Sequence, residues 1–316
     1  MRFALMTEPQ QGLSYAEILA LARTAEDAGL EAFFRSDHYG SFPNDAASPT
    51  TDAWTTLAGL ARDTTRIRLG TLVSPVTFRI PGSLAKVVAT ADEMSGGRIE
   101  LGMGAGWNEQ EHEQLGIPFP TLVERYDMLE EALAVIHGLW AEPDGWSYQG
   151  TRWHVRDARF RPKPTFGGQR HTHLILGGDG GPRLSRLVST YADEFNRQSA
   201  TPERLREAYG RVSEACVAAG RDPGTVVRSA MVGVLVAETQ GELRDRVRQQ
   251  TAMFGADADA DDWLAERRER WIIGTPDEAH QAIATLEAAG AERIMLQDFL
   301  PRDHDMVALL GRIAAG

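Results

Sequence analysis

Short β-rich runs alternate with amphipathic helical segments along the whole chain. The alternation begins with RFALM, YAEILALARTAEDAG and LEAFFRS, and it ends with RIMLQ followed by DMVALLGRIAAG. Such alternation is typical of a parallel sheet whose strands are joined by helices. We count about eight strand-helix units, the number at which a parallel sheet closes on itself. The pattern therefore predicts an α/β fold, a (β/α)8 TIM barrel, with an open doubly wound sheet as the alternative.

The length allows all of these units to form one domain. A chain of 316 residues lies within the range of a single large barrel, and no Pro/Gly/Ser-rich linker divides it, so we expect one domain over residues 1–316. Two stretches depart from the alternation: a proline-containing segment at about 141–172, and an acidic turn followed by a charged helix at about 250–272. We expect both insertions at the C-terminal face of the barrel, with one of them covering the site.

Charge and composition exclude several classes of function. The formal net charge of -12 argues against a nucleic-acid surface, which needs clustered basic charge. The chain has no apolar run near the roughly 20 residues of a membrane span, and MRFALMTEPQ lacks the features of an export signal. We therefore expect a cytoplasmic protein without nucleic-acid or membrane partners. The one cysteine, Cys216, lies in a helical pattern and is predicted to be a buried small residue.

A glycine-rich segment follows the fifth predicted strand, at the end of the barrel where active sites lie. In LGGDGGPR, glycines at 177, 178, 180 and 181 surround Asp179 at the start of a helix. Backbone amides at a helix start suit a phosphate group, and Arg183 can reach the same anion. The alternative is a tight turn that needs positive φ angles.

A second glycine-rich segment, GMGAGWNEQEH, follows the fourth predicted strand. Its glycines, Gly102, Gly104 and Gly106, allow the backbone to approach something flat or bulky. Trp107 then offers a large aromatic face to a ligand, and Glu109 is a candidate catalytic residue.

The charged residues of this second segment also have simpler interpretations. Glu109 and His112 have the i, i+3 spacing of a metal-ligand pair, but the sequence offers no third ligand, so we expect no metal. Glu109 and Glu111 otherwise fit the solvated start of a helix, where acidic side chains are favoured.

His38 is the candidate for proton transfer. It follows the second predicted strand in FFRSDHYG, and histidine titrates near neutral pH. Asp37 beside it can tune or orient a neighbouring group, and the alternative is a purely structural histidine. Gln297, at the end of the last predicted strand, can hydrogen-bond a ligand or simply close the barrel.

Several segments together resemble the bacterial luciferase-like superfamily. They are SDH at 36–38, the stretch at 53–112 that begins AWTTLAGLARDTTRIRLG, GGDGGPRLSRLVSTYADEFN at 177–196, and IGTPDEAHQAIATLEAAGAERIMLQ at 273–297. The resemblance is to the branch of oxidoreductases that use flavin mononucleotide (FMN) or the 5-deazaflavin coenzyme F420. It implies a barrel that is usually a homodimer, with the tricyclic ring lying across the C-terminal ends of the strands.

The resemblance also assigns roles to residues. It implies a non-prolyl cis peptide bond between Leu72 and Val73, in a bulge behind the ring. It makes His38 the active-site histidine. We expect Trp107 and Glu109 as the other catalytic residues, although the sugar-phosphate dehydrogenases of this branch carry a glutamate where this chain has Trp107. The expected cofactor contacts are Asp37, Leu72, Val73, Ser74, Ala105, Gly106, Gly177, Gly178, Asp179, Gly180 and Arg183.

SDH and GAGWNEQEH most resemble the F420-using members. The resemblance therefore implies an oxidoreductase that transfers hydride between F420 and a small organic substrate. One alternative is an FMN-dependent monooxygenase that uses O₂ and reduced flavin supplied by a partner reductase. The other is a cofactor-binding protein without turnover, since a fold does not by itself imply catalysis.

Overall fold

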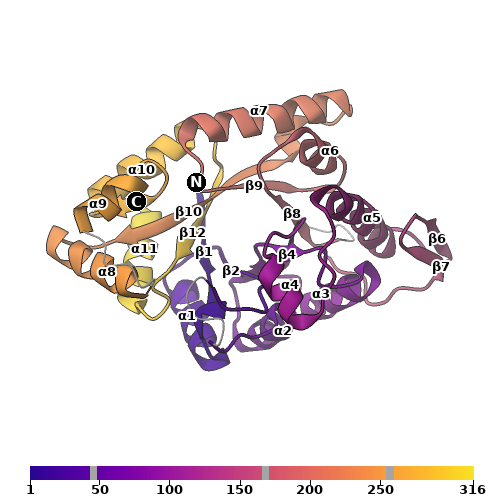
Figure 1. Cartoon of the computed structure of the whole chain (residues 1–316), viewed down its shortest axis with the longest axis horizontal. Coiled ribbons are helices and arrows are strands. Elements are labelled where there is room, and N and C mark those ends of the chain that lie inside the picture. The colour runs from indigo at the N-terminus through magenta and orange to yellow at the C-terminus, as the bar shows by residue number, and fades with distance from the viewer. Residues whose placement is uncertain (43–47, 166–170, 254–259) are drawn as a thin grey trace.

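The structure is a computed structural model that describes residues 1–42, 48–165, 171–253 and 260–316. Its centre is a closed barrel of eight parallel strands surrounded by helices (Figure 1). The barrel strands are β1 (Arg2–Thr7), β2 (Ala32–Arg35), β3 (Arg68–Thr71), β5 (Ile99–Gly104), β8 (His173–Gly177), β9 (Glu194–Gln198), β10 (Val227–Val236) and β12 (Arg293–Asp298).

Strand pairing shows that the sheet is closed. The first strand, β1, pairs with β2 on one side and with the last strand, β12, on the other. β10 completes the ring by pairing with both β9 and β12. Two short strands are added: β4 (Ser74–Pro75) pairs with β5, and β11 (Ile272–Gly274) pairs with β10. The predicted barrel is confirmed, and the open-sheet alternative is wrong because the first and last strands pair.

Helices cover the outside of the barrel. They are α1 (Tyr15–Asp27), α2 (Ala53–Asp63), α3 (Pro81–Ser95), α4 (Glu109–Leu115), α5 (Leu122–Ala141), α6 (Pro182–Tyr191), α7 (Pro202–Ala218), α8 (Gln240–Met253), α9 (Ala260–Arg267), α10 (Pro276–Ala288) and α11 (His304–Ala315), with short 3₁₀ turns at Pro9–Gln11 and Pro223–Thr225. Cys216 is buried on α7, as predicted. Among the described residues, every helix is too short or too polar to cross a membrane.

Capping residues in the sequence fix where several of these helices begin. The Ser14 hydroxyl accepts a hydrogen bond from the Glu17 N–H, and the Glu17 carboxylate accepts one from the Ser14 N–H. Thr121 and Glu124 form the same reciprocal pair at the start of α5. Such pairs satisfy N–H groups that the first turn of a helix leaves without partners.

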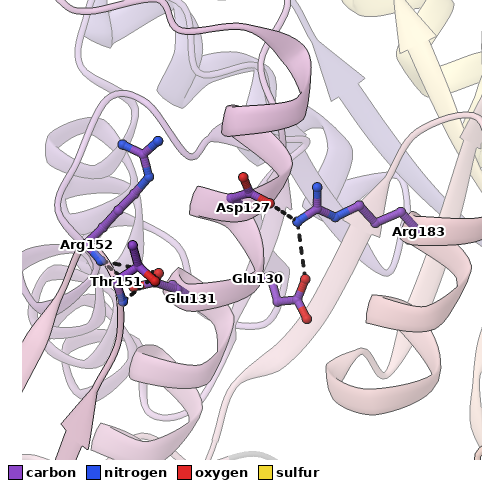
Figure 2. Close-up of a pocket in the computed structure, with 6 residues that line it drawn as sticks. All are labelled: Asp127, Glu130, Glu131, Thr151, Arg152 and Arg183. Atoms are coloured by element: carbon purple, nitrogen blue, oxygen red, sulfur yellow. Dashed lines mark hydrogen bonds and ion pairs between the residues drawn. The ribbon is translucent and has the colours of Figure 1, made fainter.

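The first predicted insertion lies away from the C-terminal face, contrary to our expectation. It contains the antiparallel hairpin of β6 (Trp146–Gln149) and β7 (His154–Ala158), which packs on the outer side of α5 (Figure 2). At its end, the Thr165 N–H donates to Asp92, which also accepts from the Ile99 N–H at the start of β5. The reason is directional: α5 runs antiparallel to the strands, so a segment that follows it begins at the amino-terminal end of the barrel.

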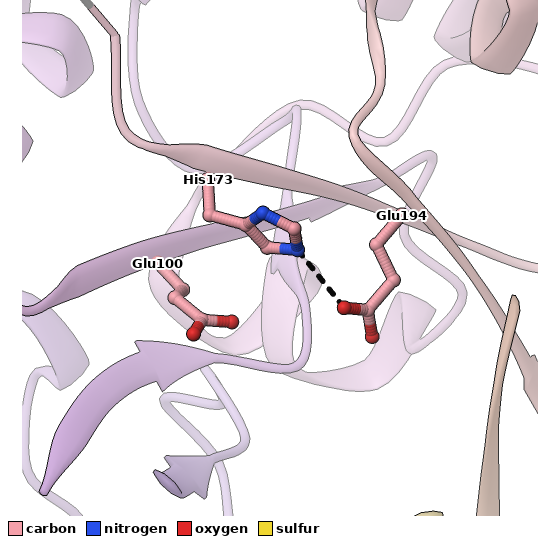
Figure 3. Close-up of side chains that lie close together, drawn as sticks. All are labelled: Glu100, His173 and Glu194. Carbon is pink, nitrogen blue, oxygen red and sulfur yellow. Dashed lines mark hydrogen bonds and ion pairs between the residues drawn. The ribbon is translucent and has the colours of Figure 1, made fainter. Parts of the chain in front are cut away.

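Arg293 places a buried positive charge at that amino-terminal end. Its side chain is fully buried at the start of β12, and its Nη1 lies 2.7 Å from Glu100 Oε2 and 3.0 Å from Glu194 Oε2. Glu100, His173 and Glu194 come from the starts of β5, β8 and β9, and their side chains point toward one another (Figure 3). From this layer toward the carboxyl ends of the strands, the barrel interior is apolar. It consists of Ala4, Met6, Ala32, Phe34, Leu72, Ile175, Met231 and Met295.

The side chains of Glu100, His173 and Glu194 have the composition of a metal site, with ligand atoms within 4.8 Å of one another. However, the Arg293 guanidinium contacts both carboxylates and supplies the positive charge that an ion would bring. Burial alone would lower the pKa of His173, but its hydrogen bond to Glu194 and the charge of Glu100 raise it. We call these four residues the ionic plug, because they close the barrel end opposite the site.

Replacing Arg293 by Met should destabilise the protein by about 3–5 kcal/mol, because two buried carboxylates would lose their shared cation. Denaturant-induced unfolding measures this change. The matched control is Arg2→Met at the same end of the barrel, where Arg2 is 43% exposed in its pair with Glu31, and its effect should stay within about 0.5 kcal/mol. Equal effects of the two substitutions would contradict a stabilising role for the plug.

Candidate active site

A cavity of about 620 Å³ opens at the carboxyl ends of the barrel strands. Its volume lies within the range of small-molecule and cofactor sites. The predicted site residues on its wall are Asp37, His38, Leu72, Val73, Ala105, Gly106, Trp107, Gly177, Gly178, Asp179 and Gln297. Ser74, Glu109, Gly180 and Arg183 do not line it.

Val73 projects from a bulge between β3 and β4, after the expected cis peptide bond with Leu72. Glycines on the neighbouring strands leave room for its side chain. A Cβ at Gly104 would lie 2.8 Å from Val73 Cγ2, and a Cβ at Gly102 or Gly177 would lie 3.1 or 3.0 Å from Cγ1. The sequence predicted that Gly102, Gly104 and Gly106 admit something flat or bulky. At Gly104 that group is Val73, which is itself part of the cavity wall, whereas the nearest atoms are the Thr71 carbonyl oxygen at Gly102 and Pro75 Cβ at Gly106.

His38 is held by a buried carboxylate. Its Nδ1 lies 2.8 Å from Glu111 Oε1, and its Nε2 has no hydrogen-bond partner among the described residues. The other oxygen of Glu111 accepts from the backbone N–H groups of Tyr39 (2.9 Å) and Gly40 (3.2 Å). Glu111 is therefore not the solvated residue that its place near a helix start suggested. The short helix α4 has no apolar periodicity in its sequence, so no signal marked Glu111 as buried.

Aromatic rings surround the His38 imidazole. Phe42 and Trp107 contact it edge-on, with ring centroids 4.7 and 5.6 Å away. Trp107 is 64% exposed, so it forms the rim of the cavity and is accessible to a ligand. Glu109, also expected near the reacting atoms, is exposed on α4 and outside the cavity wall. The catalytic role expected for Glu109 therefore stays a prediction.

His112, the neighbour of Glu111, has a structural role. Its Nδ1 donates to the Asn108 carbonyl at 2.6 Å, and its Nε2 accepts from the Thr77 hydroxyl at 2.6 Å. Both ring nitrogens are thus occupied, which leaves none for a metal ion shared with Glu109. These bonds attach α4 to the segment before α3 and so help to fix the position of Glu111.

Asp37 belongs to a buried ion pair at the cavity wall. It accepts from both terminal nitrogens of Arg79, at 2.5 and 3.2 Å, and from the Ser74 hydroxyl at 2.6 Å. Arg79 also pairs with Asp52. Burial alone would raise the pKa of Asp52, but the Thr55 N–H and the Arg79 charge lower it to about 2. Ser74 therefore acts behind the wall, where it orients Asp37.

The glycine loop presents unused backbone donors. Within the described residues, the N–H groups of Asp179, Gly180 and Gly181 have no hydrogen-bond acceptor. Arg211, from α7, donates to the carbonyls of Gly180 (2.7 Å) and Asp179 (3.2 Å). In a planar peptide the N–H points away from the preceding carbonyl, so Arg211 turns the N–H groups of Gly180 and Gly181 away from α7. Together with the start of α6, these donors suit an anion.

A second arginine beside this loop is Arg197, whereas Arg183 points elsewhere. Arg197 lies 2.8 Å from the carboxylate of Asp179. Arg183 instead reaches across to α5, where it pairs with Asp127 and Glu130 in a separate groove (Figure 2). The expectation that Arg183 reaches an anion at the loop is wrong, because its position on α6 directs the side chain toward α5. No local pattern in the sequence indicates which face of α6 meets the loop.

A row of buried polar side chains lines the β12–β1–β2 side of the cavity. Glu8 accepts from Gln297 Nε2 (2.6 Å) and from Gln10 Nε2 (2.7 Å), and Gln10 accepts from the Ser36 hydroxyl (2.6 Å). Gln297 was expected to bind a ligand or to close the barrel, and its amide does link the last strand to the first. Glu8 was missed, although it directly follows β1, where the rule that sites lie at strand ends applies equally.

The family model of the luciferase-like monooxygenases matches residues 1–293 of this chain. The chain belongs to the luciferase-like family. Two relatives illustrate its range. An F420-dependent glucose-6-phosphate dehydrogenase of Microbacterium testaceum is 33% identical over 191 residues, which is 60% of this chain. Pyrimidine monooxygenase RutA of Cronobacter sakazakii is 30% identical over 224 residues, which is 69% of this chain. This luciferase-like chain spans 54% and 62% of those relatives' lengths.

Solved structures share the luciferase-like fold over the full length. An F420-dependent secondary alcohol dehydrogenase, in complex with an F420-acetone adduct, has a TM-score of 0.82 at 20% identity and covers 99% of this chain and 97% of its own. Monooxygenase RslO1 from Streptomyces bottropensis has a TM-score of 0.83 at 23% identity, with 100% and 98% covered. At these identities the likeness supports the fold, and the function needs a separate case.

Replacing Gly104 by Ala should destabilise the protein by about 1–3 kcal/mol, because the added methyl group would overlap Val73 on a rigid strand. Thermal and denaturant unfolding measure the loss. The matched control is Gly82→Ala in α3, where a Cβ meets no atom within 4 Å and alanine favours the helix. A Gly104 variant as stable as the Gly82 variant would show that the fit between Val73 and Gly104 is loose.

Proposed function

We propose that this luciferase-like protein is an oxidoreductase that transfers hydride between F420 and a small organic substrate. The observation that carries the proposal is that one cavity joins the Val73 bulge, the glycine loop and His38 Nε2. Each of these offers a different contact: an apolar surface, backbone N–H donors and a proton-transfer group. A planar redox coenzyme with an anionic tail needs the first two, and chemistry on a substrate needs the third.

The residues present fit such a coenzyme. The ring would lie against Val73, and Ala105 and Gly106 come from the adjoining end of β5. The phosphate of the tail would accept hydrogen bonds from the N–H groups of Asp179, Gly180 and Gly181, near the positive charge of Arg197. When bound there, F420 supplies a donor or acceptor of hydride.

His38 would move the proton that accompanies hydride. As a substrate carbon loses hydride, the substrate's O–H or N–H bond breaks and His38 Nε2 accepts that proton; in the reverse direction the imidazolium returns it. Phe42 and Trp107 flank the His38 imidazole and would help to hold its orientation. The polar row from Glu8 to Gln297 offers hydrogen bonds to the polar part of a substrate.

A flavin-dependent monooxygenase is the second candidate. The likeness to a pyrimidine monooxygenase at 30% identity favours it, and such an enzyme would need a partner reductase to deliver reduced FMN. The motifs SDH and GAGWNEQEH and the likeness to an F420-dependent dehydrogenase at 33% identity favour F420. We also propose that the protein is a homodimer, as the resemblance of its sequence implies.

Titration of the purified protein with each coenzyme tests the proposal. Fluorescence quenching should show that F420 binds at least about tenfold more tightly than FMN. Stronger binding of FMN would reverse the assignment in favour of the monooxygenase. Absence of binding by both coenzymes would contradict a redox function at this cavity.

Replacing Arg211 by Met should weaken F420 binding roughly tenfold, the equivalent of one to two hydrogen bonds, because the loop carbonyls would no longer be held. Affinity for the deazaflavin chromophore without its phosphate tail should not change. Arg206→Met, on an exposed position of the same helix, is the matched control. If Arg211→Met weakened both ligands equally, the loop would not be the phosphate site.

A further inference from the structure

We propose that Glu111 is a positioning residue that fixes the tautomer of His38, with the hydrogen on Nδ1 and the lone pair on Nε2 directed to the cavity. The inference rests on the proposed function, because it assigns to Glu111 the orientation of the group that exchanges a proton with substrate. Glu111 borders the cavity, but its side chain is only 2% exposed and its carboxylate is bound by His38 and by the N–H groups of Tyr39 and Gly40, so we assign it a positioning role.

The hydrogen bonds of Glu111 determine which ring nitrogen of His38 carries the proton. Oε2 receives the N–H groups of Tyr39 and Gly40, which can only donate, and Oε1 lies 2.8 Å from His38 Nδ1. An ionised carboxylate offers only acceptors, so Nδ1 must be the donor. The neutral ring then carries its lone pair on Nε2.

Burial makes this arrangement rigid. The side chain of Glu111 is 2% exposed and that of His38 is 14% exposed. The Phe42 ring, from the segment after β2, and the Trp107 ring, from the segment between β5 and α4, contact the imidazole edge-on. On the other side of Glu111, the two bonds of His112 attach α4 to Asn108 and Thr77. The ring thus has little freedom to turn and present Nδ1 to a ligand.

Other charged groups around the cavity do not compete for His38. Asp37, adjacent in the chain, is bound by Arg79 and Ser74. Glu8, from the end of β1, is bound by two glutamine amides, and Asp179 is paired with Arg197. Tyr126, from α5, is the remaining titratable residue on the wall. Glu111 is the hydrogen-bond partner of the His38 ring within the described residues.

The substitution Glu111→Gln tests the inference without the coenzyme. The glutamine oxygen must serve the two backbone N–H groups, so its NH₂ group faces Nδ1. Nδ1 then has to accept, and the hydrogen moves to Nε2. In protein with ¹⁵N-labelled histidine, at a pH where the ring is neutral, the Nε2 resonance should move from the unprotonated to the protonated range, while Nδ1 moves the opposite way.

The matched control is Glu113→Gln, which makes the same change in charge at an exposed position of the same helix and should leave the His38 resonances unchanged. A wild-type ring with its hydrogen on Nε2, or a Glu111→Gln variant that keeps the wild-type tautomer, would overturn the inference. If the variant does not fold, the wild-type spectrum decides alone. Failure of wild-type protein to bind F420 would instead contradict the proposed function, because the spectra need no coenzyme.

Discussion

The fit of Val73 between glycines of β5 and β8 is the contact on which the cavity depends. The bulge at Leu72 and Val73 occupies the space that Gly102, Gly104 and Gly177 leave free, and it forms a partly exposed apolar surface at the barrel mouth. A larger residue at Gly104 or Gly177 would force Val73 to move, and one at Gly102 would also overlap the Thr71 carbonyl oxygen of β3. The carboxyl ends of β5 and β8 continue into the segment of Trp107 and the glycine loop. The packing of Val73 against these strands therefore sets the distances between the bulge, Trp107 and the loop.

Charge is distributed differently at the two ends of the barrel. At the amino-terminal end, Arg293 pairs with Glu100 and Glu194 in a layer buried from solvent. At the carboxyl end, the carboxylates are held at the wall: Asp37 by Arg79, Glu111 by backbone N–H groups and His38. The donors of the glycine loop and Nε2 of His38 thereby stay available to a bound molecule.

The periodic pattern of the sequence sufficed to predict the barrel, because strand-helix alternation depends on local side-chain spacing. Which arginine reaches the glycine loop could not be predicted. Arg183 is close to the loop in sequence but pairs with α5, whereas Arg197 and Arg211 reach the loop through packing of the folded chain. Glu111 lay on a helix too short and too polar for a periodic signal. The position of the hairpin after α5, by contrast, follows from strand direction and was open to prediction.

A crystal structure of the protein with bound F420 tests most directly whether the barrel mouth holds a redox coenzyme in this way. We expect the ring against Val73 with His38 Nε2 facing the space beside it, and the phosphate within hydrogen-bonding distance of the Gly180 and Gly181 N–H groups. A ring bound outside this cavity, or a phosphate held at the groove of Arg183 on α5, would contradict the arrangement.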